Sequence, residues 1–301
     1  MVVWPASGWT SEQLPDLSGR TIVVTGATSG IGRIAARDFA AHGAQVVLAV
    51  RNTERGEQVA AEMEGTTEVR RLDLTELDSV REFAEGWKGN LDILGNNAGV
   101  MAVPEGRTAE GFETQIGTNH LGPFALTGLL IDHVTDRVVT VSSGAHRFGK
   151  IRFDDLDWER DRYSRWPAYG QSKLANLLFT AELSRRLAEA GSGVRAVAAH
   201  PGYAATDLQH RTGSRLQDGL MWVTNKLVAQ SDEAGSWPTA FAATQDIPSG
   251  AYVGPDGIGE QRGHPTLVGR SGAARDEAAA SRLWVLSEEL TGVSYPLPAP
   301  A

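Results

Sequence analysis

Residues 20–41, RTIVVTGATSGIGRIAARDFAA, carry the strongest structural signal in the chain. The β-branched run at 20–26 predicts a buried strand that ends in a glycine. The segment 31–43 predicts a helix, because its apolar residues recur on one side and Gly43 stops it. A strand, a glycine-rich turn and a helix therefore follow one another directly, as in the first half of a β-α-β unit.

The same alternation of short β-branched runs and longer helical segments continues along the chain. Further strands are predicted at 45–50, 68–74, 91–99 (a strand followed by a turn), 136–143 and 194–202. Further helices are predicted at 53–64, 74–87 (with Thr75 as N-cap), about 108–131 and 169–190. The strands are nearly continuous apolar runs, as in a sheet covered on both faces. We therefore predict an α/β protein: a single Rossmann-fold domain over residues 1–301, with a doubly wound, mostly parallel sheet of about seven strands flanked by helices.

Three segments lie outside this alternation. Residues 1–17 are an N-terminal extension without the basic start and apolar core of a signal peptide. Residues 203–250 interrupt the alternation and are mixed in composition. Residues 292–301 are predicted to be a flexible tail, frayed over SYPLPAPA.

The composition excludes several classes of function. With 41% hydrophobic and 22% charged residues, the balance is that of an ordinary soluble globular protein. The net charge of −9 argues against nucleic acid and anionic membrane as partners. The absence of cysteine excludes disulfides and thiolate metal sites, and the cytoplasm is the simplest location. The longest apolar run, 124–131, is too short for a membrane span. None of the seven histidines has metal-ligand spacing, and no G-x-S-x-G elbow is present, so we expect neither a metal site nor a hydrolase.

The glycine turn after the first strand predicts a nucleotide site. Such a turn lets backbone N–H groups and a helix N-terminus hold a pyrophosphate, and its glycines let the ligand approach closely. The alternative is a glycine-rich connection without a ligand, because the spacing here is G-x-x-x-G-x-G rather than G-x-G-x-x-G.

The end of the second strand indicates which dinucleotide binds. An acidic residue there would hold the 2′-hydroxyl of NAD, whereas an arginine would accept the 2′-phosphate of NADP. The strand ends in Arg51 and Asn52 without a carboxylate, which favours NADP(H) over NAD(H). Arg33 is a second candidate for the phosphate, and for both arginines the alternative is a solvated surface side chain.

Tyr169 and Lys173 are four residues apart in a helical segment, so they lie on one side of the helix. The ordinary pKa of a tyrosine hydroxyl is near ~10, too high for a base at neutral pH, and a fixed ammonium nearby lowers it. The pair therefore predicts acid–base chemistry. The alternative is an exposed pair with no chemical role.

Five motifs occur in a fixed order: Thr25–Gly32, Asn96–Gly99, Ser142-Ser143, Tyr169-x-x-x-Lys173 and Pro201-Gly202. With them the chain resembles the short-chain dehydrogenase/reductase family over residues from about 18 to 290. The stretches AYGQSKLANLLFTAEL and SSGAHRFG are similar to the branch that contains retinol dehydrogenases and the WW-domain oxidoreductase. One departure is Gly95, where the family usually has an aliphatic residue.

The resemblance implies a catalytic set of four residues. Ser143 would hydrogen-bond the substrate oxygen, Tyr169 would exchange a proton with that oxygen, and Lys173 would lower the pKa of the tyrosine. Asn119 would hold a water that continues the proton path from the lysine. Of the other polar residues near the motifs, His146 is predicted to be structural or solvated.

The resemblance also implies the residues that contact the cofactor, NADP(H). They lie at the glycine turn and at the carboxyl ends of the strands. They are Gly26, Thr28, Ser29, Gly30, Ile31, Gly32, Arg51, Asn52, Asp73, Leu74, Asn97, Ala98, Gly99, Tyr169, Lys173, Pro201, Gly202 and Thr206. For Asp73, a helix N-cap at the strand exit is the structural alternative.

The family builds its substrate loop after Pro201-Gly202, so residues 203–250 are assigned to that region. Apolar residues there, with Trp158, Tyr163 and Trp166, would line a pocket for a lipophilic carbonyl or alcohol. The alternative is that they pack against their own domain. The expected function is that of an NADP(H)-dependent oxidoreductase, and the alternative is a non-catalytic NADP(H)-binding regulator. The helices at about 108–131 and 169–190 would form a four-helix homodimer interface, and a monomer is the other outcome.

Overall fold

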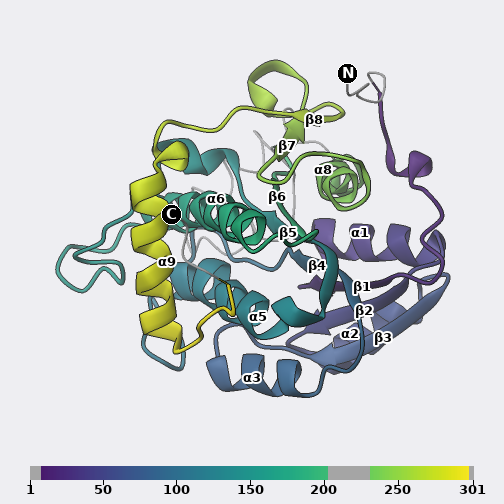
Figure 1. The fold of residues 1–301 in the computed structure, drawn as a ribbon, viewed down its shortest axis with the longest axis horizontal. Helices are drawn as coiled ribbons and strands as arrows, with labels where there is room; N and C mark the ends of the chain where they lie inside the picture. The colour runs from purple at the N-terminus through teal and green to yellow at the C-terminus, as the bar shows by residue number, and fades with distance from the viewer. Residues whose placement is uncertain (1–7, 203–230, 298–301) are drawn as a thin grey trace.

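The computed structural model describes residues 8–202 and 231–297. Its core is an eight-stranded sheet with the order β3-β2-β1-β4-β5-β6-β7-β8 (Figure 1). The strands are β1 Thr21–Thr25, β2 Gln45–Val50, β3 Thr66–Arg71, β4 Leu91–Asn96, β5 Val134–Val141, β6 Arg195–Ala199, β7 Tyr252–Pro255 and β8 Pro265–Leu267. All neighbours pair in parallel except β7 and β8. The predicted α/β sheet is confirmed, with one short antiparallel strand more than expected.

Helices cover both faces of the sheet because alternate strand residues point to opposite sides. Ile22 and Val24 face a core with α1 Gly30–Ala41, α2 Thr53–Ala60 and α8 Asp232–Thr244. Val23 faces the opposite core, which contains residues of α3 Leu77–Glu85, α5 Gly122–Leu130, α6 Arg165–Glu189 and α9 Glu277–Thr291. No helix within the described ranges is long and apolar enough to cross a membrane.

Several predicted boundaries differ from the structure. The helix expected at about 108–131 begins only with α4 Thr114–Ile116, because Arg107 and Glu113 pair in an isolated β-bridge just before it. It then passes through a π-helical turn at Gly117–Leu121 before α5. The helix expected from residue 74 begins at Leu77, and its N-cap is Glu76 rather than Thr75. The segment after β2 is helical only to Ala60.

Part of the region assigned to the substrate loop is a structural helix. Helix α8 lies within residues 203–250 and packs beside α1, where Trp9 of the N-terminal extension meets Phe241 edge to face at 5.3 Å. The remainder of the region before residue 231, with Thr206 and the apolar residues Leu208, Leu216, Leu220, Met221, Trp222 and Val223, lies outside the described residues.

The C-terminal segment is packed against the domain, so the expected frayed tail is wrong up to residue 297. Figure 1 shows α9 lying across the outside of α6 and beside α5. Trp284 of α9 is 4.4 Å from Tyr295 and 5.2 Å from Phe124, measured between ring centroids. The Tyr295 hydroxyl donates to the carbonyl of Phe124 at 2.6 Å. These aromatic contacts hold the segment down.

The same packing bears on the proposed dimer. Nearly all residues of α6 from Ala168 to Leu183 are buried within one chain, as are those of α5 apart from Leu129. Glu182 of α6, fully buried, accepts from Arg186 at 2.9 Å, and Trp284 of α9 stacks near Phe179 with ring centroids 5.9 Å apart. The helices assigned to a four-helix interface are therefore covered in cis by α9.

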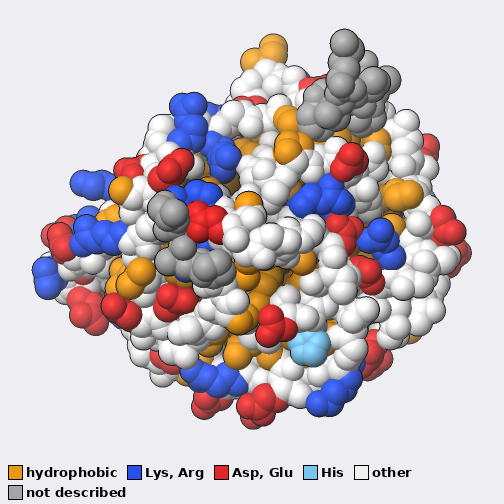
Figure 2. Space-filling view, in the orientation of Figure 1, with side chains coloured by type: hydrophobic (Ala, Val, Ile, Leu, Met, Phe, Trp, Pro, Cys, Tyr) orange, Lys and Arg blue, Asp and Glu red, His pale blue; other side chains and the backbone are white. Residues whose placement is uncertain are grey.

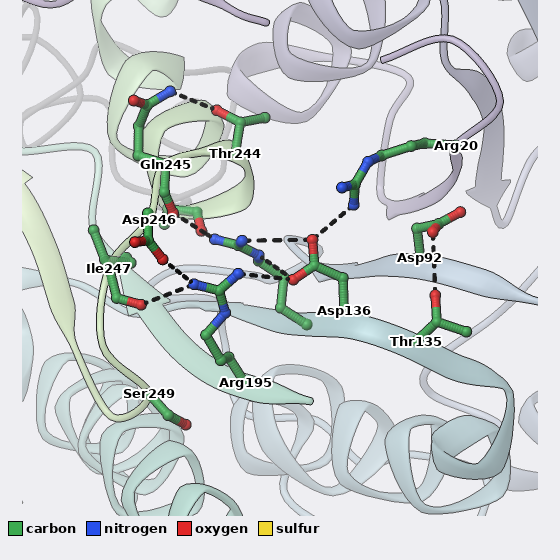
Figure 3. A network of polar contacts seen from close by, with 12 residues as sticks. Arg20, Asp92, Thr135, Asp136, Arg195, Thr244, Gln245, Asp246, Ile247 and Ser249 are labelled. Atoms are coloured by element: carbon green, nitrogen blue, oxygen red, sulfur yellow. Dashed lines mark hydrogen bonds and ion pairs between the residues drawn. The ribbon is translucent and has the colours of Figure 1, made fainter. Parts of the chain in front are cut away.

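A network of charged side chains joins the amino ends of the central strands (Figure 3). Asp136 of β5 accepts from Arg20 at 2.7 Å, from Arg137 at 3.1 Å and from Arg195 at 3.2 Å. Arg137, 3% exposed, also donates to two backbone carbonyls near the end of α8, those of Ala242 and Gln245. The network ties α8 to the edge of the sheet opposite the candidate active site.

Candidate active site

The sequence-predicted residues meet at the carboxyl ends of β1, β4, β5 and β6. The sheet order reverses between β1 and β4, and ligands of open α/β sheets bind in the crevice at such a switch point. The glycine turn follows β1, the Asn97–Gly99 turn follows β4, Ser143 follows β5 and Pro201 follows β6. A surface hollow of about 420 Å³, lined by residues around 150–155 and Arg282, contains none of them.

Two glycines let the turns after β1 and β4 approach closely. Gly26 has a φ of +68°, and a Cβ there would lie 2.9 Å from the Cβ of Ala98. A Cβ on Gly32 would lie 2.2 Å from Nδ2 of Asn97. Any side chain at these positions would push the Asn97 turn away, so packing alone requires the two glycines.

Thr25 fastens the two turns together, a role that the sequence reading did not assign. Its buried hydroxyl accepts from the backbone amides of Asn97 at 3.0 Å and Ala98 at 2.9 Å. The Asn97 side chain returns a bond from Nδ2 to the carbonyl of Thr25 at 2.8 Å. The Asn97 side chain and the amides of Asn97 and Ala98 therefore hold the turn against the end of β1.

The N-terminus of α1 faces this crevice. Ser29 is the N-cap in an extended conformation, but its side chain makes no capping hydrogen bond. The first N–H groups of a helix lack intrahelical acceptors and favour an anion such as a pyrophosphate. The cradle thus fits a dinucleotide, with Thr28, Gly30 and Ile31 beside it.

The residues assigned to the adenosine end of the cofactor differ in whether their side chains already bond to other protein groups. Arg51 is exposed at the end of β2 and has no hydrogen bond or ion pair with any described residue, whereas Arg33 pairs with Glu62 at 3.6 Å. Asn52 caps α2 by accepting from the amide of Arg55 at 2.8 Å.

Asp73 does not cap α3, which begins at Leu77. Its carboxylate instead accepts from the amide of Thr75 at 3.0 Å and from the Thr75 hydroxyl at 2.7 Å. The side chain of Leu74 is buried in the core below α5. A Cβ on Gly122, at the start of α5, would lie 2.6 Å from the carbonyl oxygen of Leu74, so Leu74 packs directly on that helix.

Ser143 and Tyr169 meet from two separate elements. Ser143 is the N-cap of a short 3-10 helix, Gly144–Phe148, and accepts from the amide of Ala145 at 3.2 Å. This short helix rests on α6 because a Cβ on Gly149 would lie 2.2 Å from the carbonyl oxygen of Gly170. Burial raises the pKa of the Tyr169 hydroxyl, and a hydrogen bond with Ser143 opposes that rise, so the net lowering of this pKa expected from Lys173 is not seen in the structure.

Lys173 lies one turn along α6 from Tyr169. Its ammonium is 5.8 Å from the centroid of the tyrosine ring and donates to the carbonyl of Val141 at 3.0 Å. Burial lowers the pKa of Lys173 to about 8. The adjacent serine, Ser142, points the other way and donates to the carbonyl of Lys173 at 2.8 Å, so it supports the helix rather than the substrate.

Asn119 lies in the π-helical turn and is fully buried. Its Oδ1 accepts from the amide of Val100 at 2.7 Å, and its Nδ2 donates to the carbonyl of Val100 and to Ser172 Oγ, both at 2.9 Å. A Cβ on Gly99 would lie 3.0 Å from this Oδ1 and 3.4 Å from Lys173 Nζ. Asn119 thus fixes the Gly99 turn beside the lysine, from a π-turn of the kind that is frequent at functional sites.

His146 and the Pro201 turn complete the site. His146 is fully buried, its Nδ1 donates to the carbonyl of Ser143 at 2.7 Å, and burial lowers the pKa of its ring. It is therefore a neutral structural residue, as the sequence indicated. Gly202, with a φ of +69°, donates its amide to His200 Nδ1 at 3.2 Å.

Comparison with known proteins identifies the family to which the chain is related. The sequence profile of short chain dehydrogenases matches residues 20–217. Retinol dehydrogenase 13 of Homo sapiens is 41% identical over 303 aligned residues, which cover 93% of this chain and 87% of that protein. Retinol dehydrogenase 12 of Homo sapiens is also 41% identical, over 95% of this chain and 90% of that protein.

Solved structures agree. An uncharacterised protein from Mycobacterium paratuberculosis is 51% identical, covers 97% of this chain and 100% of its own, and has a TM-score of 0.85. A structure from Beutenbergia cavernae, assigned as an NAD(P)-dependent gluconate 5-dehydrogenase and holding NADP at low occupancy, is 26% identical with a TM-score of 0.58 and covers 76% of this chain and 91% of its own. Together with the profile match, these similarities show that the chain belongs to the short-chain dehydrogenase/reductase family.

Proposed function

We propose that the protein is an NADP(H)-dependent oxidoreductase that transfers a hydride between nicotinamide and a lipophilic carbonyl or alcohol. The observation that carries the proposal is the meeting of Ser143, Tyr169 and Lys173 at the sheet edge that also holds the glycine cradle. A regulator that only binds the dinucleotide needs the cradle but not these three side chains.

The chain's own residues would supply binding and proton transfer. Bound NADP(H) supplies the hydride chemistry. In reduction, Ser143 would donate a hydrogen bond to the carbonyl oxygen and Tyr169 would give that oxygen a proton. Because burial raises the tyrosine pKa, the phenol holds its proton at neutral pH, which is the form that reduction requires. Lys173, with a pKa of about 8, is mainly charged at pH 7 and stabilises negative charge on the phenol oxygen as the proton leaves.

The preference for NADP(H) rests on Arg51. The guanidinium is exposed at the end of β2 and has no partner among the described residues, and no carboxylate occupies this strand end. We expect Arg51→Ala to weaken NADPH binding by about 1.5–3 kcal/mol, the value of one charge-assisted contact, and to leave NADH affinity nearly unchanged. Fluorescence titration of both cofactors measures this. Arg55→Ala is the matched control, because Arg55 is a nearby exposed cation whose guanidinium donates to Gln58, and its backbone amide keeps the Asn52 cap in the variant.

The lipophilic substrate is supported by two exposed aromatic side chains beside the catalytic tyrosine. Trp166, 46% exposed, meets Tyr169 edge to face at 6.1 Å. Phe148, 57% exposed, packs against Gly170, where a Cβ would lie 2.8 Å from its ring. Of the other aromatic residues expected in the pocket, Trp158 is buried, and the Tyr163 hydroxyl is bonded to Gln115 and Val103. Those two residues are structural.

The test is NADPH oxidation by the purified protein against a panel of aldehydes, ketones and quinones of increasing apolar size. We expect kcat/KM to rise with apolar size and to fall in Trp166→Ala. Val285→Ala is the control, because Val285 is a similarly exposed apolar residue, on α9. Tight NADPH binding without turnover on any member would instead favour the regulatory protein.

A further inference from the structure

Glu260 has a backbone conformation that its residue type disfavours. It ends the short 3-10 turn Ile258–Glu260 and has a φ of +57°. A non-glycine residue in the left-handed region is strained and persists where its surroundings fix it, commonly at functional positions. The tertiary contacts of its carboxylate explain what fixes it.

The Glu260 carboxylate bridges two segments that end at the active site. Its Oε1 accepts from Nη2 of Arg147 at 2.7 Å, and its Oε2 lies 3.2 Å from Nε2 of His200. Arg147 belongs to the short helix that Ser143 caps, and His200 directly precedes Pro201-Gly202. The interaction with His200, followed by that with Arg147, lowers the pKa of the Glu260 carboxyl to about 2, against the effect of partial burial. The Glu260 carboxylate is therefore ionised at every physiological pH, and Arg147 is its cationic partner.

The His200 ring lies between the Glu260 carboxylate and the Pro201-Gly202 turn and contacts both. The ring is 1% exposed, and its Nδ1 accepts from the Gly202 amide at 3.2 Å. This acceptor role assigns the proton of a neutral ring to Nε2, the nitrogen that faces Glu260. Gly254 leaves room for the ring, since a Cβ there would lie 2.0 Å from Nε2. A Cβ on Gly202 would lie 2.4 Å from the carbonyl oxygen of Gln261, so the turn also packs directly on the residue after Glu260.

We propose that Glu260 is a positioning residue, which holds the Pro201-Gly202 turn and the Ser143 segment at a fixed separation through His200 and Arg147. The inference rests on the proposed function, in which Pro201-Gly202 contacts the nicotinamide and Ser143 contacts the substrate oxygen. Loss of the bridge then misplaces the hydride relative to the carbonyl. The adenosine end, at the glycine turn and Arg51, shares no contact with Glu260. Turnover is therefore affected more than cofactor affinity.

Glu260→Gly separates this role from a purely structural one. Glycine adopts a φ of +57° without strain, so the variant loses the carboxylate while its backbone is relieved. We expect the Tm to stay equal or rise, the Kd of NADPH to change less than about twofold, and kcat to fall about tenfold or more, because small misplacements at a reacting centre are costly. Glu260→Gln keeps one acceptor and should lie between Glu260→Gly and the wild type. Glu76→Gln is the control, since it removes an exposed ion pair in which Glu76 Oε2 lies 3.1 Å from Nη2 of Arg71.

Hydrogen–deuterium exchange of the cofactor-free protein tests whether Glu260 holds the two segments, and it does not depend on an activity measurement. We expect Glu260→Gly to speed exchange of the Gly202 amide and of peptides covering Gly144–Phe148, and Glu76→Gln to leave both unchanged. Unchanged exchange in Glu260→Gly, or unchanged kcat, would overturn the inference, as would a parallel loss of Tm, affinity and kcat. A wild-type protein that neither binds NADPH nor reduces any carbonyl would refute the proposed function instead, while the exchange data would still show whether Glu260 couples the two segments.

Discussion

Lys173 is a buried residue, 4% exposed. Its ammonium donates to one acceptor among the described residues, the carbonyl of Val141 at 3.0 Å. Burial lowers its pKa from an ordinary 10.5 to about 8. The unfolded chain therefore binds this proton more tightly than the folded protein does. Below pH 8 the charged lysine destabilises the fold, and the penalty disappears as the pH rises from about 8 to 10.5. A difference of this size corresponds to roughly 3 kcal/mol at pH 7.

Lys173→Met should consequently make the cofactor-free protein more stable at neutral pH, by on the order of 1–3 kcal/mol, while turnover is lost. The Val141 carbonyl keeps a second donor in this variant, Nδ2 of Asn176 at 3.1 Å. Urea unfolding at pH 7 and near pH 10 measures the effect, and the gain should shrink at the higher pH. A Met variant that is less stable at pH 7 would show that the ammonium is stabilised by contacts beyond those described here.

Tyr169→Phe should lower kcat by about 10²–10⁴-fold, the usual contribution of acid–base catalysis, and leave the Kd of NADPH nearly unchanged. The ring and its contact with Trp166 are kept, and only the proton donor is removed. Tyr163→Phe is the matched control. Its hydroxyl bonds to Gln115 and Val103, so its loss should cost about 1 kcal/mol of stability without abolishing turnover. Retention of more than about a tenth of wild-type kcat by Tyr169→Phe would remove Tyr169 as the acid–base residue.

Among the elements, the strands that are long and buried on both faces could be predicted from sequence, because their apolar runs and glycine exits are local signals. β7 and β8 are short and contain glycine or proline, so they carry no such signal; β7 forms by pairing with β6, and β8 by pairing with β7. The late start of the helix at Thr114 depends on the side chain of Glu113, which accepts from the amides of Gln115 and Ile116. The sequence alone does not distinguish a glutamate whose carboxylate caps a helix from a glutamate inside a helix.

The site shows the same division. Residues of the family motifs could be placed from sequence, because the motifs repeat at fixed points of a known topology. Thr25, Ser142 and Ser172 support those residues through hydrogen bonds that neighbouring elements create. Glu260 reaches the site from more than 50 residues after Pro201, and only the folded chain brings it there. The choice of Ser143 over Ser142 came from the family resemblance, and in the structure Ser142 donates to the Lys173 carbonyl while Ser143 meets Tyr169.

Asp136 of β5 supplies a prediction about the opposite edge of the sheet. Burial alone would raise the pKa of its carboxyl, but Arg137, and after it Arg20 and Arg195, hold that pKa below its ordinary value of 3.8. Its stabilising effect is therefore present above about pH 4 and is lost as the pH falls through the folded-state pKa. Asp136→Asn should destabilise the protein at pH 7 by on the order of 3 kcal/mol, since it leaves the buried Arg137 without its carboxylate.

Guanidinium chloride unfolding of Asp136→Asn at pH 7 and at pH 3 measures this loss, which should be smaller at pH 3. The control is Asp78→Asn, whose carboxylate is 93% exposed and pairs with Arg81 at 3.1 Å. It should change stability by less than about 0.5 kcal/mol. Equal effects of the two substitutions would show that the network in Figure 3 adds nothing beyond surface pairing.

At the scale of the whole molecule, the sequence is acidic, with a net charge of −9. Figure 2 shows acidic and basic side chains interspersed over the face drawn. The covering of α5 and α6 by α9 has a further consequence for assembly. We expect light scattering at micromolar concentration to give the mass of one chain, 32.2 kDa. A mass twice as large would require an interface other than these two helices, or displacement of α9.

The packing of α9 over α5 and α6 can be weakened by changing one residue. Trp284 is 1% exposed and packs among Phe124, Phe179 and Tyr295, so Trp284→Ala should destabilise the protein by roughly 3–5 kcal/mol and promote self-association. Its neighbour Val285 is 49% exposed, and Val285→Ala should leave both stability and mass unchanged. Thermal unfolding and light scattering of the two variants give the comparison.

Helix α9 and the segment that ends at Leu297 are also the last described parts of the chain to leave the ribosome. Domains begin to fold during synthesis, so the apolar face around Phe124 and Phe179 stays bare until α9 has emerged. During that interval the nascent chain already contains Ser143, Tyr169 and Lys173 but not the residues that cover their helix. A premature stop before Glu277 would therefore remove none of the candidate catalytic residues and would still leave the cell with an aggregation-prone product.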